Sequence, residues 1–270
     1  MVKKIIFLLV VMSGSSHAAA PDPCLIFFVP GAFSSASKAA LYLKPQDYFS
    51  QYKKFFVEKG CAFGEAQFPA DGTIEERGLF LKDQASRFAL NNKGKLILVA
   101  HSQGGLDARF AIKTLKLDSI SALVTIGTPH LGSPVADWVV EQGESESFIY
   151  WVSRVLFNYD FKLLRFAGEL RSDFLKKHAD KFQAVPAVKY ASASGLCLTD
   201  CHRSLKLLDW WIKVGPGDGF TPVKNQSFGH DLGQYDLDHI SEVGVELSKN
   251  AERQRLLETV WKFLVAGLQS

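Results

Sequence analysis

The sequence is short of several features that mark other classes of protein. It has no internal repeat, no low-complexity tract and no evident linker, and its 47% hydrophobic and 22% charged residues exclude a disordered chain. Excess charge is also missing. The net charge of +3 falls to +1 once Lys3 and Lys4 are left out, which gives no reason to expect nucleic acid as a partner. A chain of 270 residues with this composition is long enough to bury the core of one globular domain.

Long hydrophobic runs are scarce, and the one at the amino end is too short to span a bilayer comfortably. Two lysines precede this apolar run, 5–12, and alanines at 18–20 provide a small-residue cleavage site. We therefore predict a signal peptide at 1–20, cleaved near Ala20, and a secreted or periplasmic mature chain without a transmembrane segment. An uncleaved anchor is the alternative. Lipid attachment at Cys24 is disfavoured because Asp-Pro precedes this cysteine.

Cysteine is sparse, with four residues in the whole chain. In an oxidising compartment an even number suggests two disulfides, and four cysteines permit three pairings. Cys197 and Cys201 close a short loop and form the expected local pair. Cys24 and Cys61 each precede an apolar run, and these two runs could be neighbouring strands. Zinc is the competing interpretation, but histidines at the spacing of a zinc finger are missing.

Strand-like and helix-like segments alternate along the mature chain. This alternation predicts an α/β fold, with a mostly parallel sheet and helices on both faces, in one domain at 21–270. Strands are expected at 25–29, 62–68, 96–100, 122–127, 187–193 and about 211–215, and helices at 46–59, 75–91, 103–116 and 251–268.

The most informative stretch is an apolar run, 96–99, that ends at a serine framed by small residues. A buried parallel strand followed by Ala-x-Ser-x-Gly-Gly demands a turn too tight for bulky neighbours. Such a nucleophile elbow holds the Ser102 hydroxyl clear of the sheet, at the start of a helix whose free N–H groups stabilise negative charge. The alternative is an N-capping serine at an ordinary strand–helix turn.

Serine catalysis in this arrangement needs an acid and then a histidine further along the chain. Asp218, between two glycines, can accept the Nδ1 proton of a histidine and fix its tautomer, although alone it would be a plain Asp-Gly turn. His239 follows and can act as general base, or simply lie near the start of a helix. The other histidines after Ser102 are His130, interpreted as a loop residue, His178, on a solvated helix face, His202, beside Cys201, and His230.

These residues resemble a known family, the bacterial secreted triacylglycerol lipases of the α/β-hydrolase superfamily, and most closely its Pseudomonas and Burkholderia type. The resemblance covers about 25–243 and weakens in the middle. It implies the α/β-hydrolase fold, with Ser102 as nucleophile, Asp218 as triad acid and His239 as general base. The motifs that carry it lie at 100–105, 125–133 with Ala136 and Asp137 after it, 218–219 and 238–243.

The resemblance extends to the amino end of the mature chain. Residues 27–33 match the family's first strand and the turn after it, although Pro30 replaces the usual histidine. The backbone N–H groups of Ala32 and Gln103 would then donate to the oxyanion. The small Bacillus lipases also begin the elbow with alanine, as Ala100 does here, which leaves the subfamily open.

The calcium site of the Pseudomonas and Burkholderia lipases is not matched. Those lipases have an aspartate two residues after the triad histidine, where this chain has Ser241, and Val245 stands where a further oxygen ligand would follow. Because a hard divalent cation needs several oxygens, we predict no metal, calcium included, and no other cofactor. Relatives in the group often need a membrane-anchored folding helper, which the resemblance adds as a candidate partner.

A segment at about 138–184 carries more aromatic and aliphatic side chains than a plain connection between sheet elements should. We predict that it forms a helical cap, or lid, whose apolar face lines an acyl-chain pocket and opens at a lipid–water interface. The alternative is core packing of a longer crossover, because aromatic stripes are usually core. Its large apolar residues are Trp138, Phe148, Tyr150, Trp151, Leu156, Phe157, Tyr159, Phe161, Leu163, Leu164 and Phe166.

Together these features predict a secreted serine lipase or esterase that hydrolyses carboxylic esters of acylglycerols through an acyl-enzyme on Ser102. A short-chain carboxylesterase or an acyltransferase is the alternative within enzymes. A non-catalytic lipid-binding protein on a hydrolase scaffold is the alternative of another class.

Overall fold

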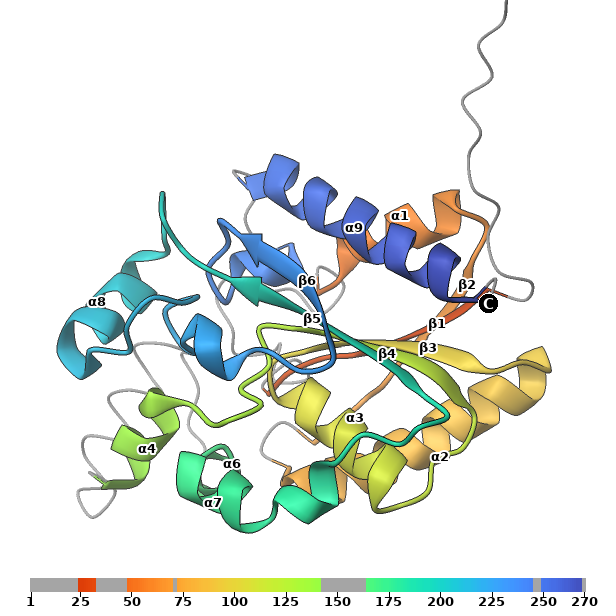
Figure 1. The fold of residues 1–270 in the computed structure, drawn as a ribbon, viewed down its shortest axis with the longest axis horizontal. Coiled ribbons are helices and arrows are strands. Elements are labelled where there is room, and N and C mark those ends of the chain that lie inside the picture. The colour runs from red at the N-terminus through yellow and green to blue at the C-terminus, as the bar shows by residue number, and fades with distance from the viewer. Residues whose placement is uncertain (1–23, 33–47, 70–71, 142–163, 245–248, 269–270) are drawn as a thin grey trace, which may run out of the picture.

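Six parallel strands form the centre of the structure, in the order β2-β1-β3-β4-β5-β6 (Figure 1). The strands are β1 (Leu25–Val29), β2 (Ala62–Glu65), β3 (Leu96–His101), β4 (Ile120–Ile126), β5 (Lys189–Gly195) and β6 (His230–Tyr235). This computed structural model describes residues 24–32, 48–69, 72–141, 164–244 and 249–268.

Helices connect the strands, and several begin at residues suited to that position. Thr73, for example, accepts the N–H of Glu76 while the Glu76 carboxylate accepts the N–H of Thr73, a reciprocal cap at the start of α2. The α-helices are α1 (Ser50–Glu58), α2 (Ile74–Asn92), α3 (Gln103–Lys113), α4 (Pro134–Glu141), α6 (Leu164–Glu169), α7 (Ser172–Lys177), α8 (Arg203–Ile212) and α9 (Asn250–Leu268). Short 3-10 helices are η2 (Ala179–Phe182), η3 (Val223–Asn225) and η4 (Ser241–Val243).

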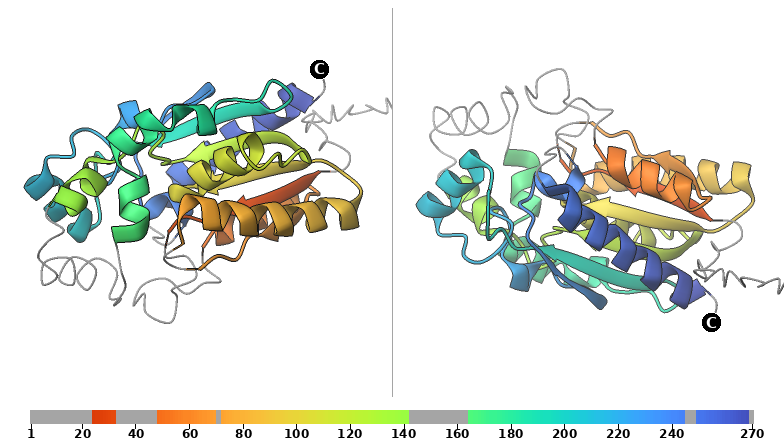
Figure 2. Two further views of the ribbon diagram at one scale, coloured as in Figure 1. Left: turned by 90° about the horizontal axis from the view of Figure 1, so that it is seen from below. Right: turned by 90° about the horizontal axis from the view of Figure 1, so that it is seen from above.

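The sheet is covered on both faces, as Figure 1 and the two views of Figure 2 show. Helices α1 and α9 pack on one face, where Phe28, Val99 and Trp261 share a core cluster. Helices α2 and α3 pack on the other face, with Phe27 and Leu98 in its cluster. Consecutive strand residues point to opposite faces, so a continuous apolar strand buries every side chain. The predicted fold class, a parallel sheet between helical layers, is confirmed.

The carboxyl ends of the four central strands meet at one edge of the sheet. Val29 of β1 lies beside Ala100 of β3, and His101 of β3 lies beside Ile126 of β4. Ile126 in turn lies beside Ala193 of β5. The loops that leave these strands therefore converge, which is where parallel α/β sheets bind ligands.

The strand predicted at about 211–215 is wrong. Residues up to Ile212 belong to α8, whose Leu205 and Leu208 are buried at helical spacing while Trp210 remains exposed. The sixth strand is β6 instead, an edge strand in which only Leu232 and Tyr235 are buried. An edge strand with one solvated side is mostly polar, so it lacks the apolar run that marks a central strand.

Other predicted boundaries moved by a few residues. The run at 62–68 forms a strand only to Glu65, and the strand expected at 187–193 spans Lys189–Gly195. The start of the helix expected at 46–59 lies partly outside the described residues, and α1 begins at Ser50. Ends of elements depend on local hydrogen bonds that periodicity does not encode.

The predicted cap falls partly outside the described residues, namely at 142–163. Of the rest, α6, α7 and η2 place Phe166, Leu175 and Phe182 against Phe110 of α3 in one buried cluster. These side chains pack as core, which is the alternative interpretation for this part of the segment. The prediction that the segment caps the site stays a prediction.

Two disulfides join neighbouring segments. Cys24 and Cys61, at the starts of β1 and β2, are bonded, and Cys197 and Cys201 close a loop after β5. Both pairs are those expected from the sequence. In the part of the chain that the structure describes, no helix has the length and apolar character needed to cross a membrane.

Candidate active site

Ser102 occupies a sharp turn between β3 and α3. Its φ of 55° and ψ of −133° lie where side chains rarely occur. Small neighbours make the turn feasible, because a Cβ on Gly31 would lie 2.8 Å from the Cβ of Ser102. A Cβ on Gly104 would lie 2.4 Å from the carbonyl oxygen of Val29. This is the geometry of a nucleophile elbow.

Asp218 lies in the loop before η3 with a fully buried carboxylate. Its Oδ1 accepts the backbone N–H groups of Phe220 (2.8 Å) and Thr221 (2.6 Å). Its Oδ2 accepts from Nδ1 of His239 at 2.8 Å. Gly219, with φ 86°, completes the tight turn. The Asp-Gly turn and the acid are therefore one feature, because the turn fixes one oxygen and aims the other at the imidazole.

The His239 imidazole joins Asp218 to Ser102. Its Nε2 lies 2.9 Å from Oγ of Ser102, although the two residues are 137 positions apart. The His239 backbone N–H donates to the Asp218 carbonyl oxygen at 2.9 Å, and the Phe220 ring stacks on the imidazole with centroids 5.0 Å apart. The structure thus brings all three predicted residues into one unbroken Asp–His–Ser hydrogen-bonded chain.

A second buried aspartate, Asp238, holds the loop that carries His239. Its Oδ1 accepts from the N–H groups of Ile240 (3.0 Å) and Ser241 (2.7 Å). Its Oδ2 accepts from the N–H of His202 at 2.7 Å. Sequence reasoning missed this role, although aspartates commonly accept amides two and three residues further on.

The two expected oxyanion donors lie on loops that meet at Ser102. Gln103 is the first residue of α3, so its N–H has no acceptor within the helix, and its side chain donates to the Gly72 carbonyl at 3.1 Å. Ala32 follows Gly31, which packs on the serine. The donor role of these two N–H groups remains a proposal.

Behind the triad, buried side chains join Glu242 to Tyr48 through His101. Nε2 of His101 lies 2.9 Å from Oε2 of Glu242, and Nδ1 lies 2.6 Å from the Tyr48 hydroxyl. The same Glu242 oxygen is 3.6 Å from Nδ1 of His239. Sequence reasoning missed this network because Tyr48 and Glu242 lie 53 and 141 positions from His101 along the chain. The motifs at 100–105 and 238–243 contain His101 and Glu242, but they do not show that these two side chains meet.

Burial sets the protonation of this network. It raises the pKa of Glu242 well above the ordinary value, and neighbouring carboxylates raise it further. Burial, and then the charge of His239, lowers the pKa of His101 well below the ordinary value. Burial also raises the pKa of Tyr48. At neutral pH His101 is therefore uncharged and Tyr48 keeps its proton.

Comparison with known proteins identifies the fold. The mature lipase of Bacillus licheniformis superposes with a TM-score of 0.69 at 21% identity, over 90% of this chain and 94% of that protein. A carboxyl esterase from a metagenome superposes with a TM-score of 0.72 at 17% identity, over 92% of this chain and 77% of that protein. This chain has the α/β-hydrolase fold.

Sequence comparisons agree with this fold. The profile of a family described as a PGAP1-like alpha/beta domain matches residues 78–159. Triacylglycerol lipase 2 of Saccharomyces cerevisiae is 31% identical over 207 residues, which make up 72% of this chain and 61% of the yeast protein. This chain thus spans less than two thirds of that relative's length. The resemblance to the Pseudomonas and Burkholderia type stays a prediction.

The other histidines that follow Ser102 lie elsewhere. His130 is buried between Arg109 and Thr125, with both ring nitrogens at 2.9 Å from a partner. The other three have partners outside the triad: the His178 ring lies tilted against Phe174, His202 bonds Ser204 through Nδ1, and His230 stacks on Phe263. His239 is therefore the histidine that the fold delivers to the serine.

One group of described residues places three possible metal ligands close together. Atoms of His101, His239 and Glu242 lie within 4.8 Å of one another. However, both nitrogens of His239 already face Asp218 and Ser102, and His101 bonds Glu242 directly. The group is therefore explained as hydrogen-bonded side chains, and the expectation of no calcium at Ser241 stays a prediction.

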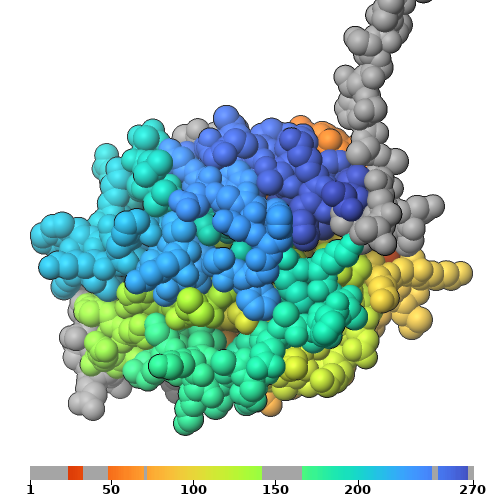
Figure 3. Space-filling view, viewed as in Figure 1, coloured from red at the N-terminus to blue at the C-terminus, as the bar shows by residue number. Residues whose placement is uncertain are grey.

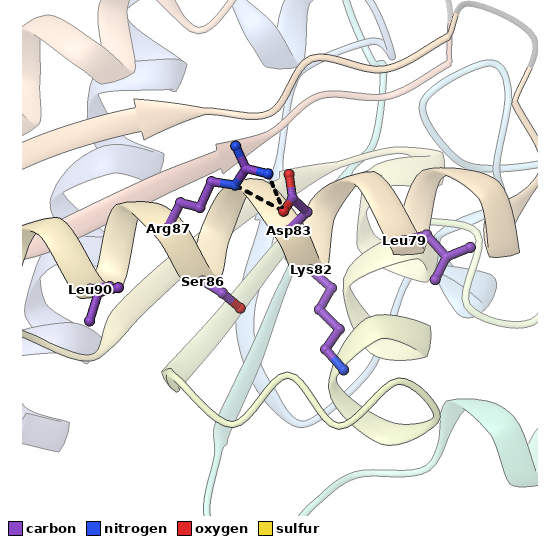
Figure 4. Close-up of a pocket in the computed structure, with 6 residues that line it drawn as sticks. All are labelled: Leu79, Lys82, Asp83, Ser86, Arg87 and Leu90. Carbon is purple, nitrogen blue, oxygen red and sulfur yellow. Dashed lines mark hydrogen bonds and ion pairs between the residues drawn. The ribbon is translucent and has the colours of Figure 1, made fainter.

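Figure 4 shows a depression on the exposed side of α2, away from the triad. Asp83 and Arg87 form an ion pair there at 2.8 Å. Because it contains none of the triad residues and is open to solvent, we assign it no part in the candidate active site. Its lining residues are Leu79, Lys82, Asp83, Ser86, Arg87 and Leu90.

Proposed function

We propose that the chain is a secreted serine lipase or esterase that hydrolyses carboxylic esters of acylglycerols through an acyl-enzyme on Ser102. The hydrogen-bonded chain from Asp218 through His239 to Ser102 carries the proposal. The names of the similar proteins support it, since they are a triacylglycerol lipase, a lipase and a carboxyl esterase. The two disulfides support an oxidising compartment, and so the predicted secretion.

The first half of the reaction forms the acyl-enzyme. Nε2 of His239 takes the proton of the Ser102 hydroxyl as Oγ attacks the ester carbonyl, and Asp218 stabilises the resulting imidazolium. The carbonyl oxygen becomes an oxyanion, which accepts hydrogen bonds from the N–H groups of Ala32 and Gln103. Each such donor is worth about 3–4 kcal/mol in other hydrolases. His239 then gives its proton to the departing alcohol.

The second half releases the acid. His239 takes a proton from water, whose oxygen attacks the acyl carbon, and the oxyanion forms again at the same two N–H groups. Collapse breaks the bond between Ser102 and the acyl group, and the proton on His239 returns to the serine oxygen. The carboxylic acid leaves, and the hydrogen-bonded arrangement of Asp218, His239 and Ser102 is restored.

Replacing the nucleophile tests the proposal. In the Ser102→Ala variant we expect turnover of p-nitrophenyl butyrate to fall by about 10⁴-fold or more, because the acyl-enzyme cannot form. Ser86→Ala, on the exposed side of α2, is the matched control and should hydrolyse the ester like the wild type. Circular dichroism checks that both variants fold. Full turnover by the Ser102 variant would remove Ser102 from the mechanism.

Chain length decides between the candidate classes. Hydrolysis of p-nitrophenyl palmitate and of triolein emulsions supports a lipase, whereas turnover of short esters alone indicates a carboxylesterase. Ester formation with added alcohol indicates an acyltransferase. A wild-type chain that turns over none of these esters and binds vesicles would be the lipid-binding protein.

A further inference from the structure

One peptide unit beside Ser102 is held at both of its polar ends. The carbonyl oxygen of Pro30 accepts from Nη2 of Arg77 at 2.7 Å. The N–H of Gly31, in the same peptide plane, donates to the hydroxyl of Tyr48 at 3.0 Å. Both side chains are buried, with exposed fractions of 0% for Arg77 and 6% for Tyr48. Water therefore does not compete for either bond.

We call Arg77 and Tyr48 together the clamp on this peptide. Arg77 is anchored in α3, the helix that follows Ser102. Nε of Arg77 donates to Oδ2 of Asp107 at 2.7 Å, and both side chains are fully buried. Asp107 lies in α3, five residues after Ser102. The guanidinium is a rigid planar fork, so its bond to Asp107 also fixes the direction of the bond to Pro30.

The Tyr48 side is anchored in the strand that ends at the serine. Because the Tyr48 hydroxyl accepts from Gly31, its own proton is free to go to Nδ1 of His101 at 2.6 Å. His101 also lies against Glu242, with its Nε2 at 2.9 Å from Oε2. His101 directly precedes Ser102. Both halves of the clamp thus reach the nucleophile's own strand or helix.

The loop that contains Pro30 and Gly31 packs closely against the turn at Ser102, and neither Gly31 nor Gly104 has room for a side chain. A Cβ on Gly31 would lie 2.8 Å from the Cβ of Ser102, and a Cβ on Gly104 would lie 2.7 Å from the carbonyl oxygen of Pro30. Glycine is the most conformationally free residue, so Gly31 by itself would not hold the next peptide in one orientation. That next peptide carries the N–H of Ala32.

We propose that Tyr48 and Arg77 are positioning residues that orient the Gly31–Ala32 peptide as an oxyanion donor toward Ser102. A trans peptide is planar, so fixing the Pro30–Gly31 plane leaves only the two dihedrals of Gly31 to set the direction of the Ala32 N–H. The inference rests on the proposed function. It also explains why the loop from Pro30 to Ala32 has a fixed geometry before substrate binds, which an oxyanion hole requires.

The Tyr48→Phe variant tests the clamp because it removes the hydroxyl and keeps the ring. We expect kcat for a soluble ester to fall about 10- to 100-fold, since small misplacements of a catalytic group have effects of this size. KM should stay within about twofold, since the donor acts in the transition state. The decisive readout is the ratio of kcat/KM for an ester to that for the matching thionoester. Sulfur accepts hydrogen bonds weakly, so loss of the oxyanion donor slows the ester more than the thionoester, and the ratio shrinks.

The matched control is Tyr235→Phe. Tyr235 is also buried, and its hydroxyl donates to the Leu232 carbonyl of its own strand at 2.9 Å. Its loss should lower stability by a similar amount while kcat and the ester-to-thionoester ratio stay at wild-type values. Arg77→Lys, which keeps a positive charge beside Asp107, should lower the ratio as Tyr48→Phe does.

The outcomes separate the clamp from the proposed function. A Tyr48→Phe variant with the wild-type ratio and kcat overturns the clamp while the proposed function stands. A fall in activity with an unchanged ratio also overturns it, because a purely structural role slows both substrates equally. A wild-type chain that turns over neither ester removes the proposed function, and the clamp with it.

Discussion

Ser102 combines backbone strain with a buried hydroxyl that is directed at a histidine. Its φ of 55° and ψ of −133° cost a residue with a Cβ roughly 1–3 kcal/mol, and such outliers persist only where the surroundings impose them. Here the surroundings are Gly31 and Gly104, which allow neighbouring backbone to approach closely. The same conformation directs Oγ to His239 at 2.9 Å. One backbone conformation at Ser102 thus causes the strain and also places Oγ for the proposed chemistry.

Two substitutions at this position measure the strain. Ser102→Ala and Ser102→Gly both lose the hydroxyl and its bond to His239, but only the glycine variant also loses the Cβ. We expect the free energy of unfolding of the glycine variant to be higher by about 1 kcal/mol, because glycine adopts positive φ without steric cost. Urea denaturation measures this difference. A glycine variant less stable than the alanine variant would show that the elbow is unstrained.

His130 is a buried residue outside the triad that should make stability depend on pH. Arg109 lies 2.9 Å from its Nδ1 and Thr125 lies 2.9 Å from its Nε2. Burial first, and the charge of Arg109 second, lower the pKa of His130 well below its ordinary value. Below about pH 6.5 the unfolded chain therefore binds a proton that the folded chain does not, so this residue destabilises the fold as pH falls.

The His130→Gln variant should reduce this acid sensitivity. Each unmatched proton lowers the free energy of unfolding by about 1.4 kcal/mol per pH unit below the unfolded-state pKa. The variant is less stable than wild type at pH 7.5. We expect this gap, the difference between their free energies of unfolding, to narrow on going to pH 5.5. Thermal unfolding at several pH values measures the gap. A gap that stays constant, or widens toward acid, would mean that His130 is protonated in the folded protein.

Individual residues of the site differed in how far the sequence could predict them. Ser102, Asp218 and His239 were predictable because each lies at a turn with a local signature and their order along the chain matches a known arrangement. Tyr48 lies in no such motif, and the motif at 238–243 contains Glu242 without indicating its partner. Their roles arise only when the fold brings them to His101 from 53 and 141 positions away.

At the scale of elements, central strands were easier to predict than the edge of the sheet. β1, β3 and β4 are buried on both faces and appear as continuous apolar runs. β6 has only Leu232 and Tyr235 as buried residues, its other four positions being three polar residues and a glycine, and it was missed. The apolar end of α8 was taken for a strand instead, because a short apolar run has no clear period.

The two disulfides should stabilise their elements unequally. Cys24 and Cys61 join β1 to β2 across 37 positions, whereas Cys197 and Cys201 are only 4 positions apart. The chain-entropy relation then gives about 4 kcal/mol for the longer loop and about 2 kcal/mol for the shorter one. Replacing both cysteines of a pair by alanine, and measuring urea unfolding, compares the two. Equal losses, or a larger loss for the short loop, would contradict this ordering.

At the scale of the whole molecule, the parallel sheet assembles the site. Loops leaving β1, β3 and β5 converge at its carboxyl edge, and they supply the clamped peptide, the elbow and the loop closed by Cys197 and Cys201. The space-filling view shows α8, which follows that last loop, projecting at one end of the molecule (Figure 3). The alternation of strands and helices predicted the layers, but the order in which strands pair depends on contacts that no single segment contains.

The central claim is that Ser102, His239 and Asp218 act as one nucleophilic unit, and covalent labelling tests it most directly. A fluorophosphonate probe reacts with an activated serine, and peptide mass spectrometry locates the adduct. The account predicts a single adduct on the peptide that contains Ser102, present in His130→Gln and lost in His239→Ala. An unlabelled wild-type chain, or an adduct on another serine, would contradict it.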